Sequence, residues 1–428
     1  MTDSWPVPRR TLLLASLGSL LGAPPALAQF RVEISGVGAT QLPIAVARFR
    51  DEDKTGVALS SIVRADLERS GLFRAADVGV ALDESAAPVF SDWRGRSVDA
   101  LVGGSATRLA DGRFDVRFKL WDVVKGADLG GQSNAVATAD LRLAAHRIAD
   151  WVYEKLTGEK GVFSTRIAYI TKTGSRYTLR VADADGENAQ VALNSPEPII
   201  SPAWSPDGKS IAYVSFESQK AVVWAQDIAS GKRRMIANFR GSNSAPAWSP
   251  DGRSIAATLS RDGNSQLYLL GVNGEDPRRL TSSSAIDTEP VFAPDGRTLY
   301  FVSDRGGGPQ IYRMAAGGGA VERVTFNGNY NISPSLSPDG RLLAYVNRNG
   351  NGFRVMVQEL AGGGTQAITD TSEDEHPSFA PNGRMIVYAT RSQGRDVLMT
   401  STVDGKIKAR LVSPLADVRE PAWGPYGR

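Results

Sequence analysis

The chain has no cysteine among its 428 residues and only two histidines, His146 and His376. Disulfide bonds, thiolate catalysis and cysteine-ligated zinc are therefore excluded. No second histidine or cysteine stands at ligand spacing from His146, so we interpret it as a surface or packed residue. The chain also has little net charge, because its 49 basic residues nearly balance its 46 acidic residues. Because no basic cluster with interleaved aromatic residues occurs, we expect no nucleic acid partner.

Catalytic motifs are missing as well. No G-x-S-x-G nucleophile motif occurs in the sequence. The glycine runs at residues 306–308, 317–319 and 362–364 lack the G-x-G-x-x-G spacing of a phosphate-binding loop and indicate turns. These absences count against a serine hydrolase and against a phosphate-binding loop, and we expect no organic cofactor.

The apolar run near the N-terminus is too short to span a bilayer comfortably. Arg9 and Arg10 precede this run at residues 11–22, and Ala26-Leu27-Ala28 forms a small-x-small cleavage site. This order predicts a signal peptide over residues 1–28 and a mature chain that begins at Gln29 outside the cytoplasm. The arginine pair leaves the choice between the general secretory route and the twin-arginine route open.

What the sequence does contain is a repeat. The first copy of its motif is Ser201-Pro202-Ala203-Trp204-Ser205-Pro206-Asp207-Gly208, and related copies follow. The leading prolines are Pro202, Pro246, Pro290, Pro334, Pro377 and Pro421, at intervals of 44, 44, 44, 43 and 44 residues. A fixed period of this size indicates a propeller, with about 40–45 residues in each four-stranded blade.

The motif combines a strand start with a tight turn. A leading proline is tolerated at the first residue of a strand, and Ser-Pro-Asp-Gly favours a type I turn. Residues 167–170 match the second strand of the repeat without a motif before them, and the last motif has no second strand after it. We therefore predict a mainly β fold: a six-bladed β-propeller over residues 161–428, with four-stranded blades and with N- and C-terminal strands that together close one blade.

Residues 29–160 lack the repeat. Apolar residues at helical spacing predict amphipathic helices over 57–70 and 140–156. Residues 30–34, 44–49, 100–109, 113–123 and 132–138 have the patterns of strands. We predict a small α/β domain over residues 29–160, with a linker to the propeller at 157–161.

The candidate site is the set of loops that enter the innermost strands. The motif aspartates recur from blade to blade and are interpreted as turn residues, whereas the residues just before the motif prolines vary. We expect these loops to surround the central channel on one face, made partly acidic by Asp287, Glu289, Asp374, Glu375 and Glu420. Two interpretations stay open: a solvated rim, with or without a trapped cation, and a docking surface for a partner.

Two other functions are kept as alternatives. An exported propeller hydrolase or lyase would use an acid at the channel mouth, such as Glu289 or Glu375. A glycan-binding propeller would stack sugars on Trp204, Trp248 and Trp423, although their shared position in the repeat favours the core.

The order of signal peptide, small α/β domain and propeller resembles the TolB family of the periplasmic Tol–Pal system. The segments that carry the resemblance are residues 161–169, 201–208, 212–218, 374–383, 408–411 and 421–426. The resemblance implies a non-enzymatic protein whose propeller face binds the peptidoglycan-associated lipoprotein Pal and whose mature N-terminal segment binds the inner-membrane protein TolA. It also implies a role in outer-membrane integrity and in invagination during cell division, membrane contact only through partners, and capture by colicins in some bacteria.

The same resemblance assigns site residues. The positions expected to bind Pal are Ser201, Asn243, Ala245, Thr288, Glu289, Glu375 and His376. The TolA-binding arm at about residues 29–35 contains Gln29, Phe30, Arg31, Val32, Glu33 and Ile34. Ser242 and Asn243 stand where the family pattern has a His-Asn pair, so the sequence departs from the family at that contact.

Overall fold

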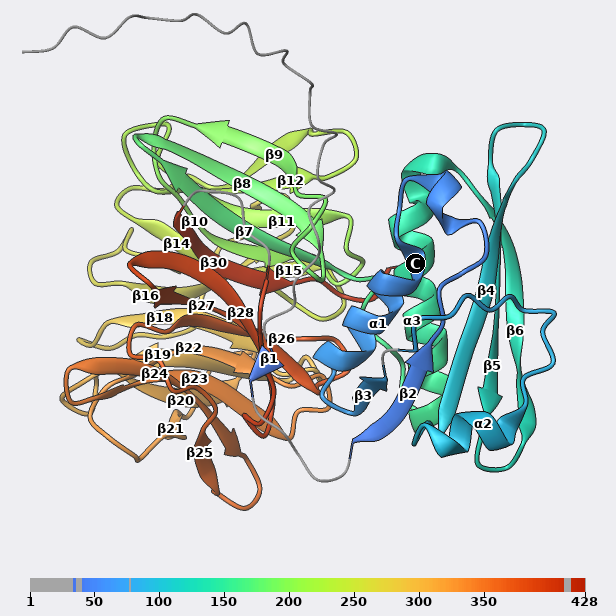
Figure 1. Cartoon of the computed structure of the whole chain (residues 1–428). Helices are drawn as coiled ribbons and strands as arrows, with labels where there is room; N and C mark the ends of the chain where they lie inside the picture. Colours follow the sequence, from blue (N-terminus) through green and yellow to red (C-terminus); the bar gives the residue numbers. More distant parts are fainter. Residues whose placement is uncertain (1–33, 36–40, 77, 412–416, 428) are drawn as a thin grey trace, which may run out of the picture. The chain divides into compact units, whose positions relative to one another are not determined.

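The structure is a computed structural model that describes residues 34–35, 41–76, 78–411 and 417–427 (Figure 1). The expected signal peptide, residues 1–28, and residues 29–33 of the expected arm lie outside this part of the chain. Within it, none of the helices combines the length and the apolar character that crossing a membrane requires.

The N-terminal region contains a five-stranded sheet in the order β3-β2-β4-β5-β6. Its strands are β2 Leu42–Val46, β3 Phe73–Ala76, β4 Ala100–Arg108, β5 Phe114–Asp122 and β6 Ala127–Val136. Its helices are α1 Leu59–Arg69, α2 Phe90–Gly95 and α3 Leu141–Thr157, with short 3-10 turns η1 Glu52–Thr55 and η2 Thr138–Asp140. Strand β2 is parallel to β3 and β4, and the β4-β5-β6 part is antiparallel.

Helices α1 and α3 form because their apolar residues recur on one face. Leu59, Val63 and Leu67 of α1 are fully buried, as are Ala145 and Val152 of α3. Together with side chains of the sheet they form one core. Burying each leucine or valine contributes about 1.5–3 kcal/mol relative to exposure. The sequence pattern thus located both helices to within about two residues, but it missed α2 and β3, which are short.

The repeats form six four-stranded antiparallel blades, as the period predicted. The first four blades comprise β10 Ile199–Trp204, β11 Ser210–Ser215, β12 Val222–Asp227, β13 Arg233–Ala237; β14 Asn243–Trp248, β15 Ser254–Leu259, β16 Gln266–Gly271, β17 Arg278–Arg279; β18 Asp287–Phe292, β19 Thr298–Ser303, β20 Gln310–Ala315, β21 Glu322–Arg323; and β22 Asn331–Leu336, β23 Leu342–Asn349, β24 Gly352–Glu359, β25 Thr365–Ala367. The fifth comprises β26 Glu375–Phe379, β27 Met385–Ser392, β28 Arg395–Thr402 and β29 Lys408–Arg410.

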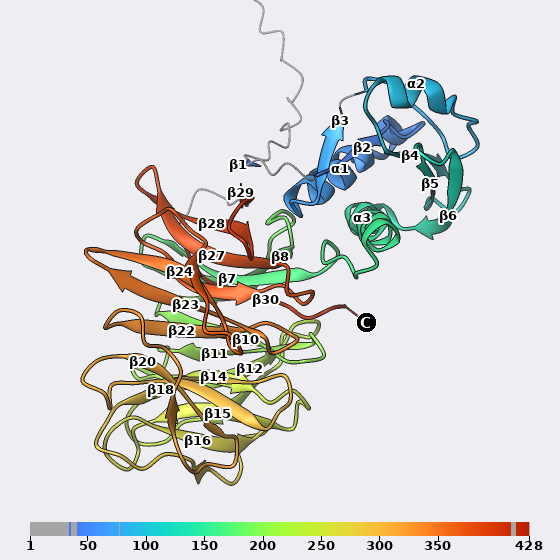
Figure 2. The same cartoon turned by 90° about the horizontal axis from the view of Figure 1, so that it is seen from below.

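The sixth blade joins the two ends of the propeller. It has the order β30-β7-β8-β9, with β30 Asp417–Trp423, β7 Arg166–Thr173, β8 Arg176–Asp183 and β9 Gln190–Ser195. Strand β30 lies beside β7 in both views (Figure 1 and Figure 2), and Ala422 pairs with Ala168. The prediction that N- and C-terminal strands close one blade is therefore confirmed.

The motif residues act locally, as expected. In the second motif, the carboxylate of Asp251 accepts hydrogen bonds from the Ser249 hydroxyl and the Arg253 backbone N–H, at 2.6 and 3.0 Å. The motif tryptophan joins neighbouring blades, because the Trp248 indole N–H donates to the Ala203 carbonyl at 3.1 Å. These bonds give the motif aspartate and tryptophan structural roles in the turn and between blades.

The fifth blade carries one additional strand. Strand β1, Ile34–Ser35, pairs antiparallel with β29, so that Ile34 lies opposite Ala409 and Ser35 opposite Lys408. The last residues of the expected arm therefore extend an outer sheet edge by backbone pairing. Edge addition of this kind depends on backbone hydrogen bonds and tolerates many side chains.

Candidate functional site

In all six blades, the residue directly before the motif proline has a positive φ, between 47° and 53°. These residues are Ser201, Ala245, Glu289, Ser333, His376 and Glu420, and we call them the motif ring. None is glycine, and the position before proline is already sterically restricted. The left-handed region costs an L-residue about 1–2 kcal/mol, so each ring position is strained.

The strain coincides with a break in each innermost strand. Pairing with the second strand shifts register there, for example between Ser244 and Ala247 of β14. The same shift occurs in the other five blades. A bulge redirects the side chain at the break, and bulges are common beside functional sites. The six ring positions carry four kinds of side chain, serine, alanine, glutamate and histidine, on one backbone geometry.

Five of the six ring residues line a cavity of about 420 Å³ at the centre of the propeller. The innermost strands of all six blades contribute to the lining, largely with motif prolines and tryptophans. A volume of this size accommodates a small ligand or a few side chains of a protein partner. Of the residues that the sequence assigned to the site, Ser201, Ala245, Glu289 and His376 meet at this cavity.

Two acidic ring residues are fixed by bonds to a neighbouring blade. The Ser333 backbone N–H donates to Glu289 at 2.6 Å, and the Ser201 backbone N–H donates to the Glu420 carboxylate. Burial raises the pKa of Glu289, while His376 and the bond from Ser333 oppose that rise. Both carboxylates thus have set orientations. Ser333 and Glu420 were not among the positions expected to bind Pal, although both stand directly before a motif proline and Glu420 was expected to make the rim acidic.

The other assigned residues are placed differently. Thr288 is partly buried in β18, and Glu375 is exposed at the start of β26. Asn243 is fully buried, and its amide donates to the carbonyls of Ala221 and Phe239 at 3.1 and 3.0 Å. Its side chain therefore holds the loop that leads into the ring.

The expectation that Asp287 and Asp374 make the rim acidic is wrong. Their side chains are buried, with 0% and 1% exposure. The carboxylate of Asp287 pairs with Arg305 at 2.9 Å, and that of Asp374 accepts a hydrogen bond from the Thr390 hydroxyl at 2.7 Å. A buried carboxylate requires such partners, and the sequence alone did not show that these two side chains turn inward. Of the other residues expected to make the rim acidic, Glu289 lines the cavity, Glu420 holds a ring position and Glu375 is exposed next to His376.

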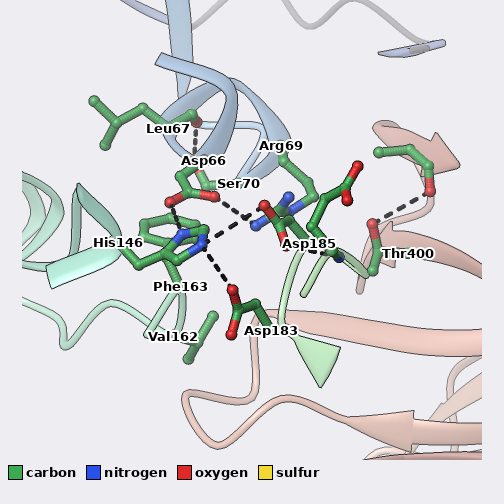
Figure 3. Close-up of polar contacts among 12 residues, drawn as sticks. Asp66, Leu67, Arg69, Ser70, His146, Val162, Phe163, Asp183, Asp185 and Thr400 are labelled. Atoms are coloured by element: carbon green, nitrogen blue, oxygen red, sulfur yellow. Dashed lines mark hydrogen bonds and ion pairs between the residues drawn. The ribbon is translucent and has the colours of Figure 1, made fainter. Parts of the chain in front are cut away.

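A metal-like cluster does occur, but away from the ring. Among the described residues, the group of acidic and histidine side chains close enough to hold a cation is Asp66, His146 and Asp185. Figure 3 shows these side chains facing one another, and His146 is 1% exposed. The interpretation of His146 as a packed residue is consistent with this burial. The expectation of a cation in the channel finds no such group among the described ring residues.

The fold and the ring place the chain among six-bladed β-propellers whose innermost strands surround a common recess. Residues 153–427 match the family model described as the TolB beta propeller domain, and residues 30–129 match the TolB amino-terminal domain. The chain belongs to the TolB family and is thus a component of the Tol–Pal system.

Similar proteins extend over nearly the whole chain. The Tol-Pal system protein TolB of Albidiferax ferrireducens is 76% identical over 403 residues, 94% of this chain and 95% of that protein. The protein of the same name from Polaromonas sp. strain JS666 is 71% identical over 98% of each chain. The crystal structure of TolB from Acinetobacter baumannii is 40% identical, with a TM-score of 0.86 over 93% of this chain and all of that one. The predicted fold class is therefore confirmed, and so is the resemblance.

Proposed function

We propose that this chain is a non-enzymatic periplasmic adaptor that binds Pal at the motif ring and TolA through its N-terminal arm. Family membership supports a place in the Tol–Pal system. The observation that carries the Pal assignment is the ring itself, six strained positions around one recess of about 420 Å³. Strain at such positions persists where the surrounding fold enforces it, and it clusters at binding sites. In this role the protein supports outer-membrane integrity and the invagination of that membrane during division.

The arm assignment rests on strand pairing. Strand β1 uses only two residues against β29, which is a short edge contact. The arm has two alternatives: to pair with β29, or to add as an edge strand to TolA. Pal shifts the population between them if it binds the two states with different affinity. Colicins would exploit the same surfaces, and a cation in the channel remains an expectation from the sequence.

The alternatives receive less support. A glycan platform needs free indole faces and edges, yet Trp204, Trp248 and Trp423 donate their indole N–H groups to Ala422, Ala203 and Thr165. A hydrolase or lyase at the channel would need a base and an attacking group within reach of one another. The ring glutamates are instead bonded to the backbone of Ser201 and Ser333.

The Pal assignment predicts a loss of binding when the charge at the ring is reversed. Glu289→Lys should weaken binding of the organism's own Pal at least tenfold in a calorimetric titration, since a cation would replace an oriented carboxylate in the recess. Glu322→Lys, the same change on the exposed outer strand β21, is the matched control and should bind Pal as the native protein does. Equal affinity of both variants would refute the ring as the Pal site.

The arm assignment predicts separate partners. Removal of residues 29–35 should abolish TolA binding and spare Pal binding, because all six ring residues remain in the chain. Any change in Pal affinity then measures the coupling between the arm and the ring. Thermal unfolding provides the control for an intact propeller. Retained TolA binding would show that another surface contacts TolA, and turnover of small substrates or capture of glycan would favour an alternative function.

A further inference from the structure

A buried charge cluster joins the helices of the N-terminal region to the sixth blade (Figure 3). Helix α1 contributes Asp66 and Arg69, and helix α3 contributes Arg142 and His146. Asp183 ends strand β8, and Asp185 follows in the turn before β9. Asp66, His146 and Asp185 are each 1% exposed. Burial of this much charge is costly unless every charge has a partner.

Most members have close partners. Arg69 pairs with Asp66 at 2.7 Å, and Arg142 pairs with Asp185 at 2.6 Å and with Asp183 at 3.3 Å. Nδ1 of His146 lies 2.6 Å from Oδ2 of Asp66. Three carboxylates therefore face two guanidinium groups, which leaves one negative charge without compensation.

The second ring nitrogen of His146 lies near two further carboxylates. Nε2 has no hydrogen-bond partner among the described residues, and it lies 3.6 Å from Oδ2 of Asp185 and 3.8 Å from Oδ2 of Asp183. A neutral ring with hydrogen on Nδ1 would direct the Nε2 lone pair at these carboxylates. A neutral ring with hydrogen on Nε2 would direct the Nδ1 lone pair at Asp66. Only the doubly protonated ring avoids both repulsions.

We propose that His146 holds a proton in the folded protein and that this cluster is a proton-dependent latch between helices α1 and α3 and the β8–β9 turn. The imidazolium donates to Asp66 and brings the cluster to neutrality through Asp183 and Asp185. Loss of that proton returns one uncompensated negative charge to a buried site, and the contact between the two regions weakens.

A metal ion suits the same residues less well. Oδ2 of Asp185 is already held by Arg142, and the two guanidinium groups would lie beside a divalent cation. A divalent ion with a neutral histidine would leave the buried cluster with net positive charge, whereas a proton leaves none. The charge count therefore favours the proton.

The direction of titration follows from the groups around the ring. Burial lowers the pKa of His146, but Asp66, Asp185 and Asp183 together outweigh it and hold that pKa above its ordinary value of 6.5. The neighbouring charged groups are Asp66 and Arg69 on α1, Arg142 and Asp150 on α3, and Asp183, Asp185 and Glu187 on β8 and its turn. A raised pKa in the folded state means that the stabilisation is fully present below pH 6.5 and is lost as the pH rises through the folded value.

The two histidines of the chain make a direct test possible. In untagged His376→Gln protein, His146 is the sole histidine, and its ring can be observed by NMR after selective labelling. We expect a titration midpoint above pH 6.5 and protonated-ring shifts for both nitrogens at pH 6. The protection factor of the Glu187 amide, whose N–H donates to Asp185, should fall above that midpoint after correction for the intrinsic rise of amide exchange with pH. A ring that is neutral at pH 6, or a protection factor that does not change across the midpoint, would overturn the proposal.

Two further measurements distinguish the proton-dependent latch from a purely structural histidine and from a metal site. His146→Gln keeps a donor for Asp66 but cannot gain charge, so the decrease in stability above pH 6.5 should disappear in this variant. Equimolar Zn²⁺ added to His376→Gln protein should leave the His146 shifts unchanged, and a stoichiometric shift would overturn the latch in favour of a metal site. Neither Pal nor TolA enters these experiments, so their outcome is separate from that of the proposed function.

Discussion

Among single residues, the feature that the six ring positions share is a positive φ angle and not a common side chain. Six non-glycine residues hold a positive φ before proline, and their side chains range from Ala245 to Glu289 and His376. Strain that is kept with such different side chains belongs to the blade geometry. The side chain at each ring position can therefore differ between blades, as contacts with a partner require.

This strain predicts that substitution by glycine changes stability differently at two positions of strand β14. Ala245→Gly should relieve left-handed strain, whereas Ala247→Gly changes a residue of the same strand whose φ is negative. We expect Ala245→Gly to be more stable than Ala247→Gly by about 1–2 kcal/mol in urea unfolding, because glycine carries no steric penalty at positive φ. Equal unfolding free energies would show that the ring is not strained.

For single residues, the sequence predicted positions in the repeat but not the directions of the side chains. The position before each motif proline identified Ser201, Ala245, Glu289 and His376, because position in a repeat is visible in the sequence. Whether a side chain turns outward is not visible, since the bulge decides it. Asp287 lies two residues before Glu289 and is nevertheless fully buried against Arg305.

At the scale of the element, the turns after the innermost strands carry titratable groups. The Ser249 hydroxyl and the Arg253 backbone N–H lower the pKa of Asp251. Burial acts against the same effect at Asp339, yet Ser337 and Arg341 lower its pKa as well. A pKa that is depressed on folding stabilises the protein above the ordinary value of 3.8, and this contribution is lost as the pH falls through the folded value.

The substitution Asp251→Asn therefore tests whether the ionised carboxylate stabilises its turn. The amide oxygen can still accept the backbone N–H, as Asn382 does in the fifth blade at 3.0 Å from Arg384. We expect a loss on the order of 1 kcal/mol at pH 7, the size of a weakened hydrogen bond, and a smaller difference from native protein at pH 3. Urea unfolding at both pH values measures it. A difference that stays the same at pH 3 would contradict the assignment of the depressed pKa.

The helices and strands differ in how well the sequence predicted them. The blades follow from local turn chemistry repeated at one period, and helices α1 and α3 follow from apolar spacing. Helix α2 has only six residues and no side-chain cap, so no local signal marked it. The charge cluster around His146 combines residues 66, 146 and 185, which only the tertiary fold brings together.

In the molecule as a whole, the propeller closes into a ring through the antiparallel pairing of β30 with β7. Ala168 and Ala422 lie opposite each other there, at a Cα separation that directly paired antiparallel residues share with disulfides. Because the chain has no cysteine, Ala168→Cys with Ala422→Cys creates one thiol pair. Its oxidation should stabilise the propeller by about 2–4 kcal/mol relative to the reduced form.

Thermal and urea unfolding of oxidised and reduced protein measure the gain, with Ala168→Cys alone as the control. The single variant should show no dependence on reductant. Failure of the double variant to form an intramolecular crosslink would contradict the register that places Ala168 opposite Ala422.

The order in which this blade is assembled has a consequence for the nascent chain. Strand β7 is made early and β30 late, with the other blades between them, so the β7 edge stays uncovered until almost all of the polypeptide has emerged. Unpaired edges of this kind attract other chains. Until β30 pairs with it, the free edge of β7 can therefore associate with other chains, so rapid closure of the sixth blade limits aggregation.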